Sequence, residues 1–412
     1  MATRLRIRMY RTGFGDCFLM SFGAAASARH VLIDFGVHQK GDIGTMGGVM
    51  DNIESTTGRK LALLVATHAH RDHISGFGQF ADRFARFEIG DVWMPWTDNP
   101  HDEDAAAFER KQLAQYDRLE QHLRLAAAAS HNPATYEPAL AAVGNLRGNG
   151  KAKSELARAF GTGVQPQYLA AGASMAKVAG IAGLSADILA PSRKTEFLGR
   201  EAPPASQRFL TAGGAETNAV HPFPNLEIRV GDLDYQAIVG QGQPTLSLDE
   251  LEQLHQMAEV PADRLALALE KVRNNTSLVI LFRFQGRSLL FPGDAQWGSW
   301  QSWIGTPGAE RLLAEVDFLK VGHHGSENAT PVDVVNALKS ELAVMVPTQT
   351  LPFPTIPRMP LLAKLGAHAP GQTVVRSDCV DVENAPRGPR PKGGLPRGFT
   401  PGDLWIDYRV QP

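Results

Sequence analysis

The chain has 412 residues, of which 43% are hydrophobic and 20% are charged, a balance typical of globular proteins. Its net charge of -2 gives no overall basic field for nucleic-acid binding, although it does not exclude a local basic surface. Two cysteines, Cys17 and Cys379, are too few for a disulfide framework. The N-terminus has no apolar signal core, and no apolar run reaches the roughly 18 residues of a membrane helix. We therefore expect a cytoplasmic protein without a membrane partner.

Four apolar segments near the N-terminus predict β-strands. Residues 5–9 alternate between apolar and polar side chains, as half-buried strands do. Residues 17–20, 31–33 and 61–66 are continuous apolar runs, which are typical of strands covered on both faces. The last run leads directly into Thr67 and His68.

The middle of the chain predicts helices. Residues 103–129 carry large apolar side chains at near-helical spacing, which indicates a long amphipathic helix. Residues 138–160 and 246–272 also predict helices, the latter broken at Pro261. Residues 192–225 are rich in Gly, Pro and Ala and predict a loop.

Strand signals return after residue 276. Residues 277–282 and 288–291 predict a β-hairpin that turns at Gln285-Gly286. Residues 318–321 and 343–346 predict two further strands. Residues 404–410 predict a last strand at a sheet edge.

Two strand-rich parts separated by helices indicate a layered α/β fold. We expect a single domain over 1–412, with a core formed by 1–96 and 273–412. A mostly helical insert at about 97–272 is expected to cover the cleft like a cap.

The strongest chemical signal is Thr67-His68-Ala69-His70-Arg71-Asp72-His73, at the end of an apolar run. Imidazole and carboxylate groups are the ligands that zinc uses where thiolates are absent. Ligands at a strand end are held by the sheet behind them, which gives a metal site its rigidity. A polar surface loop is a poor alternative for three His and one Asp in this order. The segment therefore predicts a metal site.

The order His68-x-His70-x-Asp72-His73 resembles the signature of the metallo-β-lactamase superfamily. Three later or earlier segments also match its pattern: Leu32-Ile33-Asp34-Phe35-Gly36, Phe291-Pro292-Gly293-Asp294 and Lys320-Val321-Gly322-His323-His324-Gly325-Ser326. The doubled His before Gly-Ser, and the opening Gly13-Phe14-Gly15-Asp16, are most similar to the hydrolase domain of ComEC-type DNA-uptake proteins. The resemblance covers about 1–95 and 272–380 and leaves the insert unexplained.

This resemblance implies a four-layer αββα sandwich with one or two bound zinc ions, and manganese as a possible substitute. The implied metal ligands are His68, His70, Asp72, His73, Asp294 and His324. The implied catalytic residues are Asp72 and His323, with Asp34, Asn275 and Ser326 in supporting or structural roles.

One segment departs from the superfamily pattern. A third histidine usually precedes the hairpin, but this chain has Asn274-Asn275-Thr276-Ser277 there. A first ion would then have only His68, His70 and the bridging Asp294. A second would have Asp72, His73, Asp294 and one late histidine, for which His324 is favoured because His-x-Ser matches related nucleases. A protein that binds only the second ion is the alternative.

The expected activity is hydrolysis by a metal-activated water. The resemblance favours a phosphodiester substrate, in a nucleic acid or a small molecule, and basic residues between 147 and 208 could contact phosphates or could simply be solvated. Hydrolysis of a lactone, thioester or β-lactam is the first alternative. A metal-binding sensing module without turnover is the second. Protein partners are not indicated.

Overall fold

The computed structural model describes residues 5–24, 27–40, 44–129, 136, 140, 149–200, 203–209, 273–349, 356–368, 374–378 and 395–410. The chain divides into two compact units. The first, called here the sheet unit, comprises residues 1–106, 149–214 and 272–412. The second comprises residues 107–148 and 215–271, and its described part is chiefly helix α4 (Glu103–Ala129).

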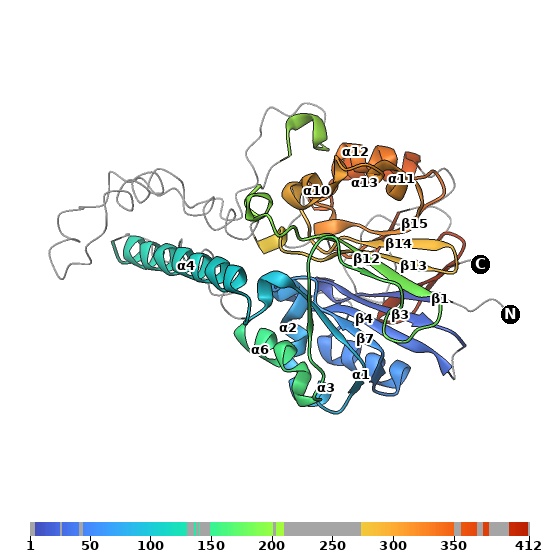
Figure 1. The fold of residues 1–412 in the computed structure, drawn as a ribbon, viewed down its shortest axis with the longest axis horizontal. Helices are drawn as coiled ribbons and strands as arrows, with labels where there is room; N and C mark the ends of the chain where they lie inside the picture. Colours follow the sequence, from blue (N-terminus) through green and yellow to red (C-terminus); the bar gives the residue numbers. More distant parts are fainter. Residues whose placement is uncertain are drawn as a thin grey trace. The chain divides into compact units, whose positions relative to one another are not determined.

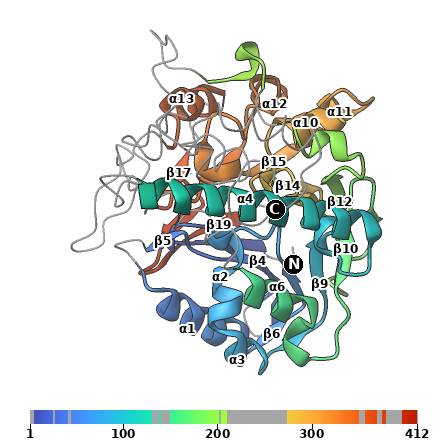
Figure 2. The ribbon, with the colours of Figure 1, turned by 90° about the vertical axis from the view of Figure 1, so that its left-hand side faces the viewer.

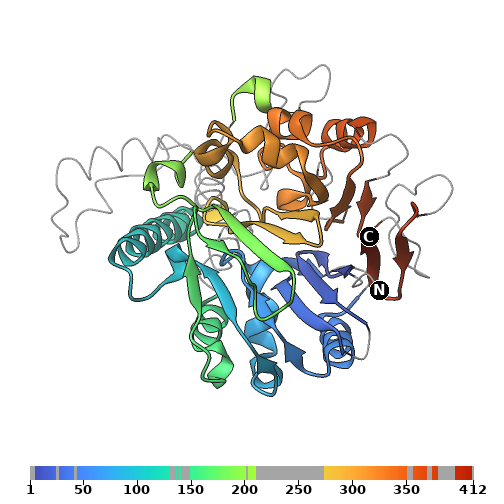
Figure 3. The same cartoon turned by 45° about the vertical axis from the view of Figure 1, so that its right-hand side comes forward.

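The first sheet has eight strands in the order β10-β9-β7-β4-β3-β1-β19-β18. These are β1 (Leu5–Tyr10), β3 (Cys17–Phe22), β4 (Arg29–Phe35), β7 (Leu63–Val65), β9 (Val92–Pro95), β10 (Gln167–Leu169), β18 (Phe399–Pro401) and β19 (Trp405–Val410). Strands β4, β7, β9 and β10 run parallel to their neighbours in this series. Strands β1 and β19, near the two ends of the chain, pair antiparallel (Figure 3).

The second sheet has seven strands in the order β11-β12-β13-β14-β15-β16-β17. These are β11 (Ser174–Met175), β12 (Leu184–Ala190), β13 (Val279–Phe284), β14 (Arg287–Phe291), β15 (Val316–Lys320), β16 (Ala343–Val346) and β17 (Val375–Arg376). Strands β14 to β17 are parallel. Two short ribbons pair β2 (Gly13–Phe14) with β5 (Gln39–Lys40) and β6 (Lys60–Leu61) with β8 (Glu88–Ile89).

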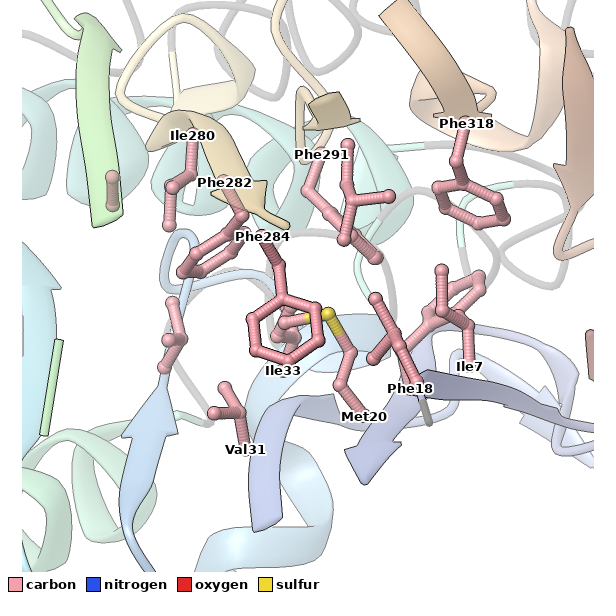
Figure 4. Close-up of a cluster of buried hydrophobic side chains, with 14 of the residues drawn as sticks. Ile7, Phe18, Met20, Val31, Ile33, Ile280, Phe282, Phe284, Phe291 and Phe318 are labelled. Atoms are coloured by element: carbon pink, nitrogen blue, oxygen red, sulfur yellow. The ribbon is translucent and has the colours of Figure 1, made fainter. Parts of the chain in front are cut away.

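A hydrophobic core lies between the two sheets, and Figure 4 shows side chains from both meeting there. The ring centroids of Phe18 and Phe291 are 5.7 Å apart, with an edge-to-face geometry. Phe22 meets Phe284 at 4.9 Å in the same way. Aromatic pairs of this kind add stabilisation beyond the area they bury. The inward face of each sheet is therefore fixed against the other.

Helices cover the outer face of each sheet (Figures 1 and 2). A second core packs the first sheet against α1 (Met46–Thr57), α2 (Arg71–Gln79), α3 (Ala81–Phe84) and α6 (Gly150–Ala157). A third packs the second sheet against α10 (Trp297–Ile304), α11 (Ala309–Ala314), α12 (Val332–Ala337) and α13 (Met359–His368). The fold is thus mixed α/β. Among the described residues, no helix combines the length and the apolar character needed to cross a membrane.

Most expected elements of the sheet unit are present. The hairpin of β13 and β14 turns at Gln285 and Gly286, which have φ values of 50° and 78°. Residues 404–410 do form a strand, but the expectation that it lies at an edge is wrong, because β18 pairs with its outer side. Helix α4 spans 103–129, as the apolar spacing predicts. The helices expected at 246–272 lie outside the described residues.

The structure differs from the expected insert at 97–272. Residues 167–190 supply β10 to the first sheet and β11 and β12 to the second. In β12 the residues Leu184, Ala186, Ile188 and Ala190 are buried and alternate with partly exposed ones. This period-two pattern is weak in the sequence, because two of its four buried side chains are alanine.

We expect Phe291→Ala to lower the free energy of unfolding by about 3–5 kcal/mol, because a buried phenyl ring is replaced by a cavity. Phe291 is 1% exposed and contacts the rings of Phe18, Phe282 and Phe318. Urea unfolding measures the change. As a control, Met359→Ala removes a side chain that is 56% exposed, so it should shift stability by no more than about 0.5 kcal/mol. Equal effects of the two variants would contradict the assigned core.

Candidate metal centre

The candidate site lies where parallel strands of both sheets end. The metal loop, residues 67–73, follows β7, and Asp34 lies near the end of the parallel neighbour β4. In the second sheet Asp294 follows β14, while the late-histidine turn, residues 322–325, follows β15. Side chains after the carboxyl ends of parallel strands gather at one edge of a sheet. The Leu278 N–H donates to the Thr67 carbonyl over 2.9 Å and joins the two edges.

The metal loop is packed closely against the chain that leaves β4. A Cβ added to Gly36 would lie 2.4 Å from the carbonyl carbon of Asp72 and from the backbone nitrogen of His73. The Asp16 N–H donates to the Asp72 carbonyl over 2.9 Å. Only glycine at position 36 allows this approach, so the backbone itself fixes the loop.

Four side chains converge from three distant parts of the sequence. The ligand atoms of Asp72, His73, Asp294 and His324 all lie within 4.8 Å of one another. His73 Nε2 is 3.0 Å from Asp294 Oδ2, and His324 Nε2 is 2.9 Å from Asp72 Oδ2. Two imidazoles and two carboxylates at this spacing could hold a metal ion. We call these residues the metal group.

Hydrogen bonds outside the metal group orient both of its histidines. His73 Nδ1 donates to Asp34 Oδ2 over 2.7 Å, and His324 Nδ1 donates to the Pro347 carbonyl over 2.8 Å. Asp34 is itself held, because the Thr67 N–H and Oγ1 each donate to it over 2.7 Å. Each Nε2 therefore faces the metal group, which is the arrangement that metal-binding histidines use. The resemblance implies a supporting role for Asp34, and its hydrogen bond to His73 is the contact through which Asp34 would act.

His68 and His70 form a pair beside the metal group rather than part of it. His68 Nε2 lies 3.0 Å from His70 Nδ1, and the His68 ring centroid is 4.1 Å from that of His73. Two nitrogens on one tetrahedral zinc ion would be about 3.3 Å apart, given Zn–N bonds of about 2.0 Å. The pair could therefore contribute two ligands to an ion.

The segment before the hairpin has a structural role. The Asn275 side chain donates to the Arg200 carbonyl over 2.8 Å and accepts from the backbone N–H groups of Gln296 and Ser299, each over 3.1 Å. Its polar atoms are thus occupied by the backbone around α10. Asn275 therefore holds the backbone around α10 in place.

Two ligand atoms of the site are buried without a hydrogen bond of regular geometry. They are His73 Nε2 and Asp294 Oδ2, which face each other at 3.0 Å. Buried polar atoms in native proteins are almost always paired, and an exception calls for an explanation such as a bound ion. A divalent cation coordinated by these atoms would satisfy them, so the residues present fit a metal.

The charge of the site also favours a cation. Asp16, Asp34, Asp72 and Asp294 surround His73, and their charges outweigh the effect of burial and raise the pKa of His73 well above its usual value. Burial likewise opposes a charged His324, but Asp72, Asp294 and Asp16 raise the pKa of His324. A metal ion would compete with protons for these imidazoles.

The other three histidines of the site, His68, His70 and His323, are neutral at neutral pH. Burial lowers the pKa of His70 to about 3 and that of His323 to about 4, and it lowers the pKa of His68 well below its usual value. A neutral imidazole keeps the lone pair that a metal ion or a proton needs.

The backbone directs the side chains of His323 and His324 into different surroundings. His323 and His324 have φ values of 43° and 53°, in the left-handed region that non-glycine residues rarely adopt. His324 enters the metal group, where the Phe14 ring packs 4.0 Å from it between centroids. His323 instead contacts Ser326 Oγ at 2.8 Å through its Nδ1. The geometry thus places the favoured histidine, His324, among the candidate ligands and leaves His323 beside them.

Two charged residues of the site, Lys320 and Asp16, are not among the metal ligands and supporting residues that the resemblance implies. Lys320 is 2% exposed, and it forms ion pairs with Asp294, at 3.2 Å, and with Asp16. The sequence contained a signal for it, because a lysine at the end of the apolar segment Phe318-Leu319-Lys320 is unusual in a buried strand.

We expect Asp34→Asn to weaken metal binding about 10–100-fold. Both Asp34 oxygens accept hydrogen bonds, from Thr67 and from His73 Nδ1, whereas an amide has only one acceptor oxygen. The His73 ring would then lose its orientation. Competition with a coloured chelator measures the affinity, and circular dichroism checks the fold. Asp51→Asn is the matched control, since that side chain is 71% exposed and pairs with Arg83. Unchanged affinity in Asp34→Asn would contradict the orienting role.

No protein-family model matches the chain, and no curated protein matches it in sequence.

Proposed function

We propose that the protein is a metal-dependent hydrolase with the metallo-β-lactamase fold. The observation that carries the proposal is the convergence of Asp72, His73, Asp294 and His324 into one group. Their order along the chain is that of the superfamily motifs. Two facing sheets with helices outside are also what its αββα sandwich requires, so fold and site support the same assignment.

Two sets of residues would hold metal. Asp72, His73, Asp294 and His324 form the more complete set, with a donor from each residue. His68 and His70 form a two-nitrogen set that would depend on Asp294 for a third donor. Imidazole and carboxylate donors suit zinc, with manganese as the alternative. We therefore propose unequal occupancy, with the metal group filled first.

A bound divalent ion would supply Lewis acidity and lower the pKa of a water molecule toward 7. Asp72 is the member of the metal group that reaches solvent, with its side chain 13% exposed against 0–1% for the other three. Its carboxylate can accept a proton or hydrogen bond from an attacking water and so orient it. His323, held through Nδ1 by Ser326, can donate a hydrogen bond to a substrate oxygen or leaving group through Nε2.

The substrate class we propose is a phosphodiester, in a nucleic acid or a small molecule. Support comes from the resemblance of the His323-His324-Gly325-Ser326 turn to ComEC-type hydrolase domains, which is an argument from analogy. Arg71, an exposed residue of the metal loop, would suit an anionic substrate.

We expect Asp72→Ala to lose at least about a hundredfold in turnover, the lower range for removing a general base. The panel is bis-p-nitrophenyl phosphate, a cyclic dinucleotide, single- and double-stranded DNA, a lactone and a thioester. Asp82→Ala, at an exposed position of α3, is the control and should retain wild-type rates. Turnover of the lactone or thioester alone would replace the phosphodiesterase assignment. Metal binding without turnover of any substrate would instead favour a sensing module.

Removing the metal should also lower stability. A ligand that binds only the folded state adds about 2.7 kcal/mol when it is present at 100 times its dissociation constant. We expect chelator-treated protein to melt at a lower temperature and to recover on addition of Zn²⁺ or Mn²⁺. Mg²⁺, which prefers oxygen ligands, should restore less. Identical melting with and without Zn²⁺ would contradict a metal site in the folded protein.

A further inference from the structure

Lys320 places a positive charge directly behind the metal group. It is the last residue of β15, and its side chain is 2% exposed. Its Nζ donates to the Gly293 carbonyl over 2.7 Å and to Asp294 Oδ1 over 3.2 Å. It also forms an ion pair with Asp16, whose side chain is 2% exposed.

The two oxygens of Asp294 consequently differ. Oδ1 accepts from Lys320 Nζ and from the His323 backbone N–H, which lies 3.0 Å away. Oδ2 is buried without a hydrogen bond of regular geometry, 3.0 Å from His73 Nε2 and 4.0 Å from His324 Nε2. A carboxylate oxygen that already accepts two hydrogen bonds has little capacity left for a cation. Oδ2 is the oxygen available to a metal.

We propose that Lys320 is a positioning residue that limits Asp294 to one metal-binding oxygen. Asp16 holds the ammonium in place, and Asp16 is itself fixed by its N–H bond to the Asp72 carbonyl. The buried relay Asp16–Lys320–Asp294 thus links the metal loop to the chain after β14. This inference rests on metal binding at the metal group, which is the proposed function.

The relay should control the coordination number. Carboxylates bind metals through one oxygen or two, and a second oxygen adds a ligand. With Lys320 removed, Asp294 Oδ1 keeps only the His323 N–H and can turn toward the ion. A site held at low coordination number would then gain a ligand, and the open position that a substrate or water needs would be lost.

Cobalt substitution can test this without any substrate. Co²⁺ replaces zinc in most nitrogen and oxygen sites, and its visible d–d absorption per bound ion falls as the coordination number rises. We expect Lys320→Met to lose absorption per bound cobalt relative to the wild type, with bound cobalt counted by elemental analysis. Lys339→Met is the matched control, because Lys339 pairs with Asp317 at a partly exposed position and should leave the spectrum unchanged.

A second variant distinguishes the loss of Lys320 from a general loss of stability. Lys320→Met alone leaves two buried carboxylates without their cation, which is destabilising. The double variant Asp16→Asn/Lys320→Met removes both ends of the ion pair, and it should show the same loss of cobalt absorption. Asp16→Asn alone keeps the lysine but removes the carboxylate that holds its ammonium, so it should lose part of the cobalt absorption and less than Lys320→Met loses.

The outcomes separate the inference from the function beneath it. A wild-type spectrum in cobalt-loaded Lys320→Met or in the double variant would overturn the role of Lys320 and leave the metal site standing. If the wild-type protein bound no cobalt or zinc at all, the proposed function itself would be contradicted.

Discussion

The structure depends on negative charge that is buried around His73. Four carboxylates, those of Asp16, Asp34, Asp72 and Asp294, face this imidazole, and a buried carboxylate is stable only when it is paired. Part of the pairing comes from Lys320 and part from donors such as the Thr67 hydroxyl. The remaining negative charge faces the two imidazoles of the metal group, where a proton and a metal ion would compete.

The scaffold makes that concentration of charge possible. Parallel strands of both sheets end at the site, and the aromatic core between the sheets fixes one set of ends against the other. The loops that follow are held by backbone contacts, such as the approach of Gly36 to the metal loop, and by buried hydrogen bonds, such as those from Thr67 to Asp34. Precision of this kind is what a catalytic metal requires, because a displacement of about 1 Å at the reacting group can cost about a hundredfold in rate.

Two features make the site asymmetric. The metal group draws a donor from each of four residues, whereas the His68–His70 pair offers two nitrogens, because the segment before the hairpin has Asn274 and Asn275 instead of a histidine. The late-histidine turn adds a further asymmetry, since its left-handed backbone sends His324 inward and leaves His323 beside Ser326. In the proposed hydrolase, this arrangement would separate metal binding, at His324, from proton exchange, at His323.

The sequence alone determined the main early and late strands of the sheet unit and the residue types of the site, because both are local. An apolar run ending in His68-x-His70-x-Asp72-His73 is visible without coordinates. Tertiary structure decided which residues meet. The choice of His324 over His323 depends on backbone torsions, and Lys320 and Asp16 become partners only when the metal loop lies against β15. Strand β12 and the interior position of β19 also required the folded chain, because pairing between distant strands leaves little trace in either segment.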